Sequence, residues 1–135
     1  MSHQTTPNYP STASTLTLVA GILIILWGVL LMSFSVFILP NINYTNVQTP
    51  QHVSNVHGLV SGFIGLVGVF ELVSGVIVLA SSFMLKADPE RWKTWGVLAL
   101  VFSVLSFLGF GGFVAGGVLG IVGGIKALTW KRPAQ

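Results

Sequence analysis

The stretch GFGGFVAGGVLGIVGG, residues 109–124, decides the fold of this chain. Its glycines Gly112, Gly116, Gly120 and Gly124 recur every four residues, so on a helix they form one groove without side chains. In water such a helix is disfavoured by about 1 kcal/mol per glycine relative to alanine. In lipid the helix is enforced because every backbone group must be hydrogen-bonded, and small residues let a second helix approach closely. The neighbours are Phe, Val, Leu and Ile rather than the polar residues of a phosphate-binding loop, so the stretch predicts a membrane helix with a packing groove.

The overall composition indicates a membrane protein. Of 135 residues, 53% are hydrophobic and only 7% are charged, whereas soluble globular domains contain about 25% charged residues. The six Lys and Arg residues flank apolar segments, which is typical of contacts with lipid headgroups, so no nucleic-acid partner is expected. The absence of cysteine excludes disulfides and thiolate chemistry, and no cofactor or metal site is predicted.

The first half of the chain contains two long apolar segments joined by a polar linker. Residues 1–15 lack an apolar period, which predicts a disordered tail. The first span covers residues 16–39 and the second covers residues 58–85, and each is long enough to cross a hydrocarbon layer of about 30 Å. The linker from Asn41 to Val56 has no charged residue, and it contains Asn43 in an Asn-x-Thr pattern, a candidate glycosylation site.

The segment from Thr94 to Leu128 raises the main question of topology. As one helix it would be about 50 Å long, well beyond the bilayer core, and it would separate the two groups of basic residues. A turn near Gly109 to Gly111 gives spans at 94–109 and 111–128 instead. All the basic residues then lie on one side, as the positive-inside rule expects. The sequence therefore favours four spans over three.

These observations predict an all-α integral membrane four-helix bundle built from two helical hairpins. Residues 16–128 form its single membrane domain, and residues 129–135 form a basic tail. We expect a multi-pass protein of the cell membrane, with the N- and C-terminal tails and the loop Lys86–Lys93 in the cytoplasm. The linker Asn41–Val56 is expected to be external.

A second face of small residues is predicted in the second span. Gly58 and Gly62 are spaced by four residues, and so are Ser61 and Gly65, while Gly68 and Gly75 lie further along. Small residues at this spacing lie on one side of a helix and let another helix approach closely. This face and the groove of residues 112–124 are therefore the predicted helix-packing surfaces.

Glu71 is the residue that breaks the apolar pattern inside a span. It lies near the midpoint of the second span, where an ionisable residue costs at least about 2.5 kcal/mol and indicates a functional site. A low dielectric favours the neutral, protonated carboxyl. At a similar depth, Trp27 of the first span offers an indole N–H, and Ser103 and Ser106 of the third offer hydroxyls. We therefore expect a buried polar cluster of Glu71, Trp27 and Ser103, with Ser106 nearby.

The last hairpin resembles uncharacterised four-helix membrane proteins of archaea and bacteria. The resemblance rests on Trp95-Gly96-Val97-Leu98 and on the glycine-rich end of the chain from Gly123 to Pro133. It implies a small helical bundle and carries over no catalytic residue. The chain is also similar in size to the small multidrug resistance transporters, but their essential glutamate lies in the first helix and Glu71 lies in the second. Claudin-like proteins have four spans too, but the chain lacks their cysteine pair and large first loop.

No combination of residues in the sequence indicates an enzyme, since there is no HExxH motif, Walker-type loop or pair of carboxylates within a span. The leading hypothesis is a non-catalytic accessory or scaffold subunit of a larger membrane complex, or a self-associating bundle that packs through its glycine faces. Its expected partners are the lipid bilayer and other membrane subunits or copies of itself. A small proton-coupled transporter that uses Glu71 is the alternative, and a lipid-organising or holin-like protein is a third hypothesis.

Overall fold

The computed structural model describes residues 9–38, 51–108 and 114–131, and within those ranges it is all-helical, with no strand. The predicted helical class and the number of helices are confirmed. The first helix, α1, spans Ser11–Ser33 and continues into a π-helical turn, η1, at Phe34–Ile38. The remaining elements, in chain order, are α2 Gln51–Ala87, the 3-10 turn η3 Pro89–Arg91, α3 Trp92–Leu108 and α4 Val114–Leu128.

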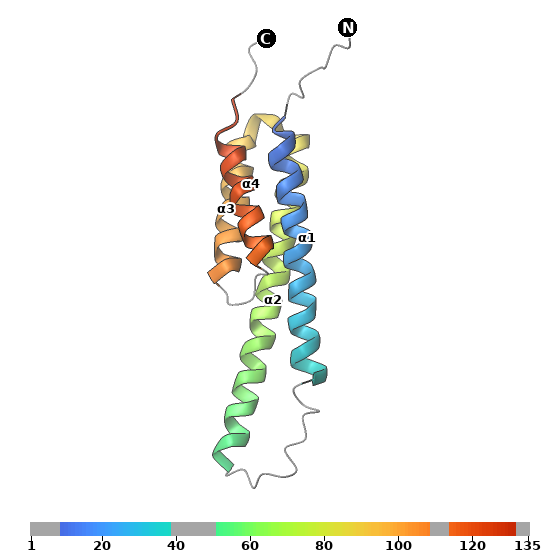
Figure 1. Ribbon diagram of the computed structural model, residues 1–135, viewed down its shortest axis with the longest axis vertical. Helices are drawn as coiled ribbons and strands as arrows, with labels where there is room; N and C mark the ends of the chain where they lie inside the picture. The colour runs from blue at the N-terminus through green and yellow to red at the C-terminus, as the bar shows by residue number, and fades with distance from the viewer. Residues whose placement is uncertain (1–8, 39–50, 109–113, 132–135) are drawn as a thin grey trace.

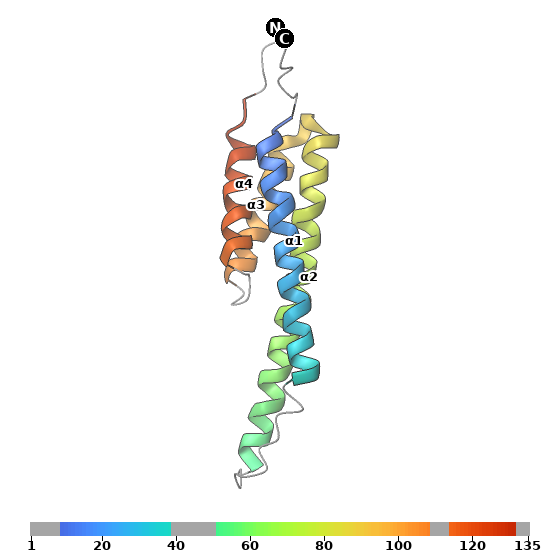
Figure 2. The same ribbon diagram turned by 45° about the vertical axis from the view of Figure 1, so that its right-hand side comes forward.

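The helices form two hairpins of unequal length (Figure 1). In the long hairpin α1 and α2 run antiparallel, and the short hairpin of α3 and α4 lies beside only one end of it (Figures 1 and 2). Each helix packs against two neighbours, α1 on α2, α2 on α3, α3 on α4, and α4 back on α1. Four helices therefore surround one interior at the end where α2 reaches Ala87. At the other end α1 and α2 continue without the short hairpin. We call this part the overhang, residues 31–38 and 58–68.

α1 begins at Ser11, not at residue 16, so residues 11–15 are helical and the prediction of a disordered tail is wrong for them. Tertiary contacts account for the longer helix. Ala13 forms a buried cluster with Leu85 of α2 and Ala127 of α4, and Ser14 is also fully buried. Packing of this kind extends a helix beyond its apolar segment, because most helical stability in proteins comes from tertiary contacts. The part of the predicted tail before residue 9 lies outside the described residues.

α2 begins at Gln51, not at residue 58, so the predicted external linker overlaps the helix. The sequence from Gln51 to His57 contains neither proline nor glycine, and Pro50 precedes it, a residue that suits the start of a helix. Asn43 lies outside the described residues, as does the predicted turn from Gly109 to Gly111. The helices on either side of that turn end at Leu108 and begin at Val114.

The bundle has an interior of mostly small and polar residues, with the aliphatic side chains of Ile24, Val78 and Leu85 among them, and an apolar exterior. Its fully buried residues include serines on all three of α1, α2 and α3, whereas Leu59, Leu66 and Phe63 on α2 are 74%, 71% and 62% exposed. This is the reverse of a soluble domain, whose apolar side chains point inward. Two helical segments, Ser11–Ile38 and Gly58–Ala87, are long and apolar enough to cross a membrane, with mean hydropathies of 2.5 and 2.4.

Candidate functional site: a buried carboxyl between glycine contacts

The long hairpin is joined by a repeat of small residues spaced by seven. α1 and η1 carry Ser14, Gly21, Gly28 and Ser35, and α2 carries Ser61, Gly68, Gly75 and Ser82. Because the helices are antiparallel, the order serine, glycine, glycine, serine in one helix faces the same order in the other. We call these eight residues the heptad seam. A seven-residue spacing keeps successive residues on one line of contact between two helices.

At its centre the heptad seam brings the two backbones into contact. A Cβ added to Gly21 would lie 2.9 Å from the backbone nitrogen of Leu79, and one added to Gly28 would lie 3.1 Å from the carbonyl oxygen of Gly68. A Cβ on Gly75 would in turn lie 3.2 Å from the carbonyl oxygen of Gly21. Backbone atoms cannot move aside as side chains do, so only glycine fits at these positions.

At its ends the heptad seam is closed by hydrogen bonds from serine to the opposite backbone. Ser14 Oγ donates to the carbonyl oxygen of Ser82, and Ser82 Oγ donates to that of Ser14, each over 2.9 Å. At the far end Ser35 Oγ donates to the carbonyl oxygen of Ser61 over 2.8 Å. Ser61, Gly68 and Gly75 belong to the face predicted from the sequence, whereas the seam as a whole follows from a seven-residue spacing that the prediction did not include.

The glycines of α4 contact two helices, not one. A Cβ on Gly116 would meet Leu23 and Ile24 of α1, whereas one on Gly124 would meet the backbone nitrogen of Leu100 on α3 at 3.1 Å. Gly120 lies between them, because its Cβ would press on both Ser103 of α3 and Ala20 of α1. A spacing of four residues turns the contact by about 40° per step, since a helix has 3.6 residues per turn. The single groove predicted from the sequence is therefore divided between α1 and α3.

Two glycines outside the predicted groove complete these contacts. A Cβ on Gly123 would lie 3.1 Å from the backbone nitrogen of Thr17 on α1, and one on Gly117 would lie 3.1 Å from Cδ2 of Phe107 on α3. Gly112, the first residue of the predicted groove, lies outside the described residues. The sequence indicates Gly117 and Gly123 as well, because Gly117 directly follows Gly116 and Gly123 directly precedes Gly124.

The predicted face of α2 lies mostly in the overhang. A Cβ added to Gly58 or Gly62 would meet nothing within 4 Å, so neither glycine is at a helix contact within the described chain. Gly65 faces the hydroxyl of Ser35, with its virtual Cβ 3.3 Å from Oγ, and Ser61 accepts the hydrogen bond of the seam. The reason is the length of the short hairpin, which ends before it reaches this part of α2 (Figure 1).

Glu71 of α2 is fully buried at the level where the short hairpin ends. The hydroxyl of Ser106 on α3 donates a hydrogen bond to its Oε2, while Oε1 has no hydrogen-bond partner within the described chain. One turn nearer to Ala87, the hydroxyls of Ser74 and Ser103 are also buried without a described partner. The helices thus bring one carboxyl and three hydroxyls into the interior of the bundle.

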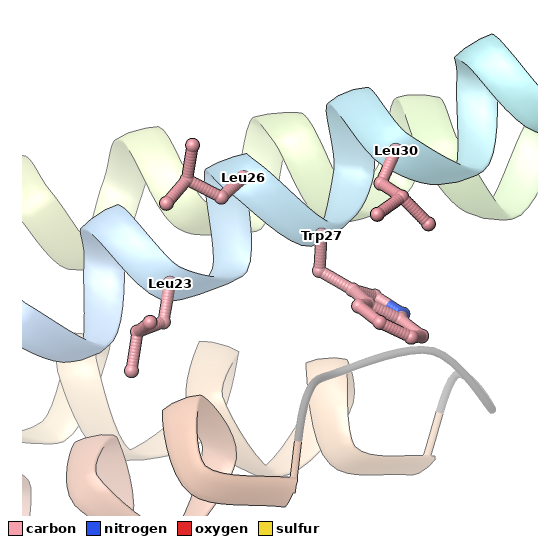
Figure 3. Close-up of a pocket in the computed structure, with 4 residues that line it drawn as sticks. All are labelled: Leu23, Leu26, Trp27 and Leu30. Atoms are coloured by element: carbon pink, nitrogen blue, oxygen red, sulfur yellow. The ribbon is translucent and has the colours of Figure 1, made fainter.

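Of the predicted polar cluster, Ser103 shares this interior with Glu71, but the hydrogen bond to the carboxyl comes from Ser106. Trp27 leaves α1 on the side of the short hairpin, with α2 behind α1 (Figure 3). It lines an apolar groove of about 230 Å³ together with Leu23, Leu26 and Leu30. Its indole therefore forms part of a groove wall, and the carboxyl is held by α3 instead.

The opposite end of the bundle gathers basic and aromatic side chains. We call it the basic end; its described cations are Lys86, Arg91, Lys93, Lys126 and Lys131. There the end of α2, the start of α3 and the end of α4 lie together (Figure 1). Trp92 and Trp130 meet edge to face with ring centroids 6.0 Å apart, and Lys93 Nζ lies 5.4 Å from the Trp92 ring centre. Arg91 forms an ion pair with Asp88 over 3.8 Å. Trp rings and cations of this kind are typical of a membrane interface.

Within the described ranges, no three or more His, Cys, Asp or Glu residues gather that could hold a metal ion.

Comparison with known proteins assigns the chain to a family. No curated protein and no solved structure matches the chain. A family model described as a protein of unknown function (DUF4064) matches residues 9–109, which include α1, α2 and α3. The resemblance noted in the sequence rested on the last hairpin, which the family match overlaps only over residues 95–109. The chain belongs to the DUF4064 family of proteins of unknown function.

Proposed function

We propose that the chain is a non-catalytic, four-span membrane protein that works by binding other membrane helices, as an accessory or scaffold subunit of a larger complex or with copies of itself. The observation that carries this proposal is the overhang, where the long hairpin loses the cover of the short one. Both hairpins lie in the membrane in this proposal, with the two tails and the basic end on the cytoplasmic side.

The apolar exterior supports the membrane location, and the helix lengths indicate how each hairpin fits the bilayer. At 1.5 Å per residue α3 and α4 are roughly 25 and 22 Å long, whereas the hydrocarbon core of a bilayer measures about 30 Å. With the basic end at the cytoplasmic headgroups, the described helices of the short hairpin are shorter than a bilayer core of full thickness, so they cross where the bilayer is locally thinner. The long hairpin continues beyond them.

The overhang offers large apolar side chains on both of its helices. Val36 of η1 is 59% exposed, and Leu59, Phe63 and Leu66 of α2 are exposed as well. A small groove of about 90 Å³ lies between Leu31, Phe63, Ile64 and Val67. Helices associate in lipid by close packing of complementary surfaces, and this part of the chain has helix surface that no described helix covers.

The structure changes where association is expected. The hypothesis of a bundle that associates through its glycine faces included the glycines of α4, but Gly116 and Gly120 are buried against α1 and α3 within the chain. Substitution of either glycine would therefore disturb the fold first. The overhang replaces them as the proposed contact surface.

Single-cysteine cross-linking tests this proposal, because the chain has no cysteine of its own. We expect Leu66→Cys and Leu59→Cys, in native membranes or after purification in mild detergent, to cross-link to a second copy or to another membrane protein. Val97→Cys, an exposed position on α3 near the basic end, is the matched control and should cross-link much less. A chain that migrates alone and gives no product from the overhang would contradict the proposal.

A further inference from the structure

Within the residues that the structure describes, Glu71 has no counter-ion in the bundle. Neither α1 nor η1 contains a charged or titratable residue, and the only ones on α3 and α4 are Lys93 and Lys126, both at the basic end. On α2 the others are His52 and His57 near its start and Lys86 at its end. The other charged residues that the structure describes after Glu71 also belong to the basic end; they are Asp88, Glu90, Arg91 and Lys131. A buried carboxyl without an opposite charge takes up a proton rather than remain ionised.

The hydrogen bond from Ser106 engages only one of the two carboxyl oxygens. Ser106 donates to Oε2, so Oε1 is the oxygen that is open to the acidic proton. Oε1 has no partner in the described chain, so the proton is not held by a second protein group. It can therefore be given up and taken back without breaking a contact within the bundle.

The polar groups nearest to Glu71 lead toward the basic end. Ser74 and Ser103 lie one helical turn in that direction, both fully buried, and their hydroxyls have no partner within the described residues. Ser81 and Ser82 follow beyond the buried apolar cluster of Ala20, Ile24 and Val78, and their hydroxyls donate to backbone carbonyls. In the opposite direction α2 has no polar side chain before Ser61. Unpartnered buried hydroxyls bind water readily, since each can both donate and accept.

Gly120 of α4 creates the space in which one of these hydroxyls lies. A Cβ at this position would fall on Ser103 Oγ and only 2.7 Å from Ser103 Cβ. The glycine therefore admits a polar group to the interior where any other residue would displace it. This contact joins α4 to the same polar interior as Glu71.

We propose that Glu71 is a proton-binding site within the membrane domain, carrying one exchangeable proton on Oε1 that is supplied and released on the side of the basic end through Ser74 and Ser103. The step is a transfer of one proton between the carboxyl and water, and no other bond changes. The proposal goes beyond association through the overhang, since a scaffold protein does not need a proton site.

Infrared spectroscopy of the full chain reconstituted in lipid tests the proposal. At neutral pH we expect the C=O stretch of a protonated carboxylic acid, shifted to lower frequency after transfer to D₂O. Glu71→Gln should abolish this band, while the matched controls Asp88→Asn and Glu90→Gln at the basic end should leave it unchanged. Ser106→Ala should move the band to higher frequency, because the hydrogen bond to Oε2 is lost. These readings do not depend on partner binding, so they are independent of the cross-linking result.

The route is tested by the rate of the shift in D₂O. The double variant Ser74→Ala/Ser103→Ala should slow the exchange by about tenfold, the effect of raising a barrier by roughly one hydrogen bond. The control Ser61→Ala, on the far side of Glu71, should leave the rate unchanged. Absence of the band in the wild-type chain, or a band that never shifts in D₂O, would overturn the proton site. Equal slowing by Ser61→Ala would overturn the route.

Discussion

The two hairpins both depend on glycine, but they use it in different ways. In the long hairpin glycines spaced by seven residues place two backbones in contact along one line, from Gly21 opposite Gly75 to Gly28 opposite Gly68. In α4 glycines spaced by three and four residues face α1 and α3 in turn. The physical cause is the turn of the helix, since a step of seven residues drifts by about 20° and a step of four by about 40° in the other direction.

The difference shows that the interval between small residues indicates how many neighbours a helix has. A seven-residue interval is typical of one close neighbour, and mixed intervals of three and four spread the contact over two. A search for four-residue spacing alone finds α4 but misses the heptad seam. The comparison leads to four predictions, from the largest expected effect to the smallest.

The largest effect is expected at the centre of the heptad seam. Gly75→Leu would put side-chain atoms against the backbone of α1, where a Cβ alone already lies 3.0 Å from the nitrogen of Ile25. Overpacking of this kind costs about 3 kcal/mol or more, and we expect loss of the folded hairpin. Thermal unfolding in detergent measures the effect. Gly62→Leu is the matched control on the same helix, and an equal loss of stability there would refute the role of the seam.

A smaller effect is expected in α4, because the short hairpin can separate while the heptad seam still holds the long hairpin. Gly124→Leu would collide with the backbone of Leu100 on α3 and should destabilise the bundle by about 2 kcal/mol. A cysteine pair placed across α3 and α4 should then cross-link poorly, while a pair across α1 and α2 should react as before. Simultaneous loss of both cross-links would show that the two hairpins do not separate.

The serines at the ends of the heptad seam should contribute less than its glycines. Ser14→Ala and Ser82→Ala each remove one of the reciprocal hydrogen bonds, and each should cost about 1 kcal/mol. A double-mutant cycle in an unfolding assay gives the coupling between them. Ser33→Ala provides the comparison, because the Ser33 hydroxyl bonds within α1, to the carbonyl of Val29, and should matter little.

The smallest effect on stability is expected from Glu71→Gln. The amide keeps a carbonyl oxygen for Ser106, so the free energy of unfolding should change by less than about 0.5 kcal/mol. Glu71→Leu removes the acceptor and leaves the buried Ser106 hydroxyl unsatisfied, which should cost about 1–3 kcal/mol. Comparison of the two variants by chemical unfolding separates the packing role of the residue from its acidity. A large loss with glutamine would show that the negative charge itself stabilises the bundle.

The sequence was sufficient for the helical class, for the four helices and for Glu71 as the buried carboxyl, because long apolar runs and one interrupting charge are local signals. It was not sufficient for the helix ends. Residues 11–15 are polar except for Ala13, and they are helical because Ala13 and Ser14 have partners on other helices. Nor could it place Trp27, since the side of α1 that faces α2 is set by Gly21 and Gly28 through their contacts with α2.

The heptad seam also restricts how far α1 can slide along α2. A shift by one helical turn would bring bulky side chains against the glycine backbones, so it is excluded by overlap. A shift by seven residues, about 10 Å along the axis, would again place Gly28 opposite Gly75 and put only small residues at the contact. In that alternative the hydrogen bonds from the hydroxyls of Ser14, Ser82 and Ser35 to the carbonyl oxygens of Ser82, Ser14 and Ser61 are broken. The glycines thus reduce the possible alignments to a few discrete ones, and the terminal serines select among them.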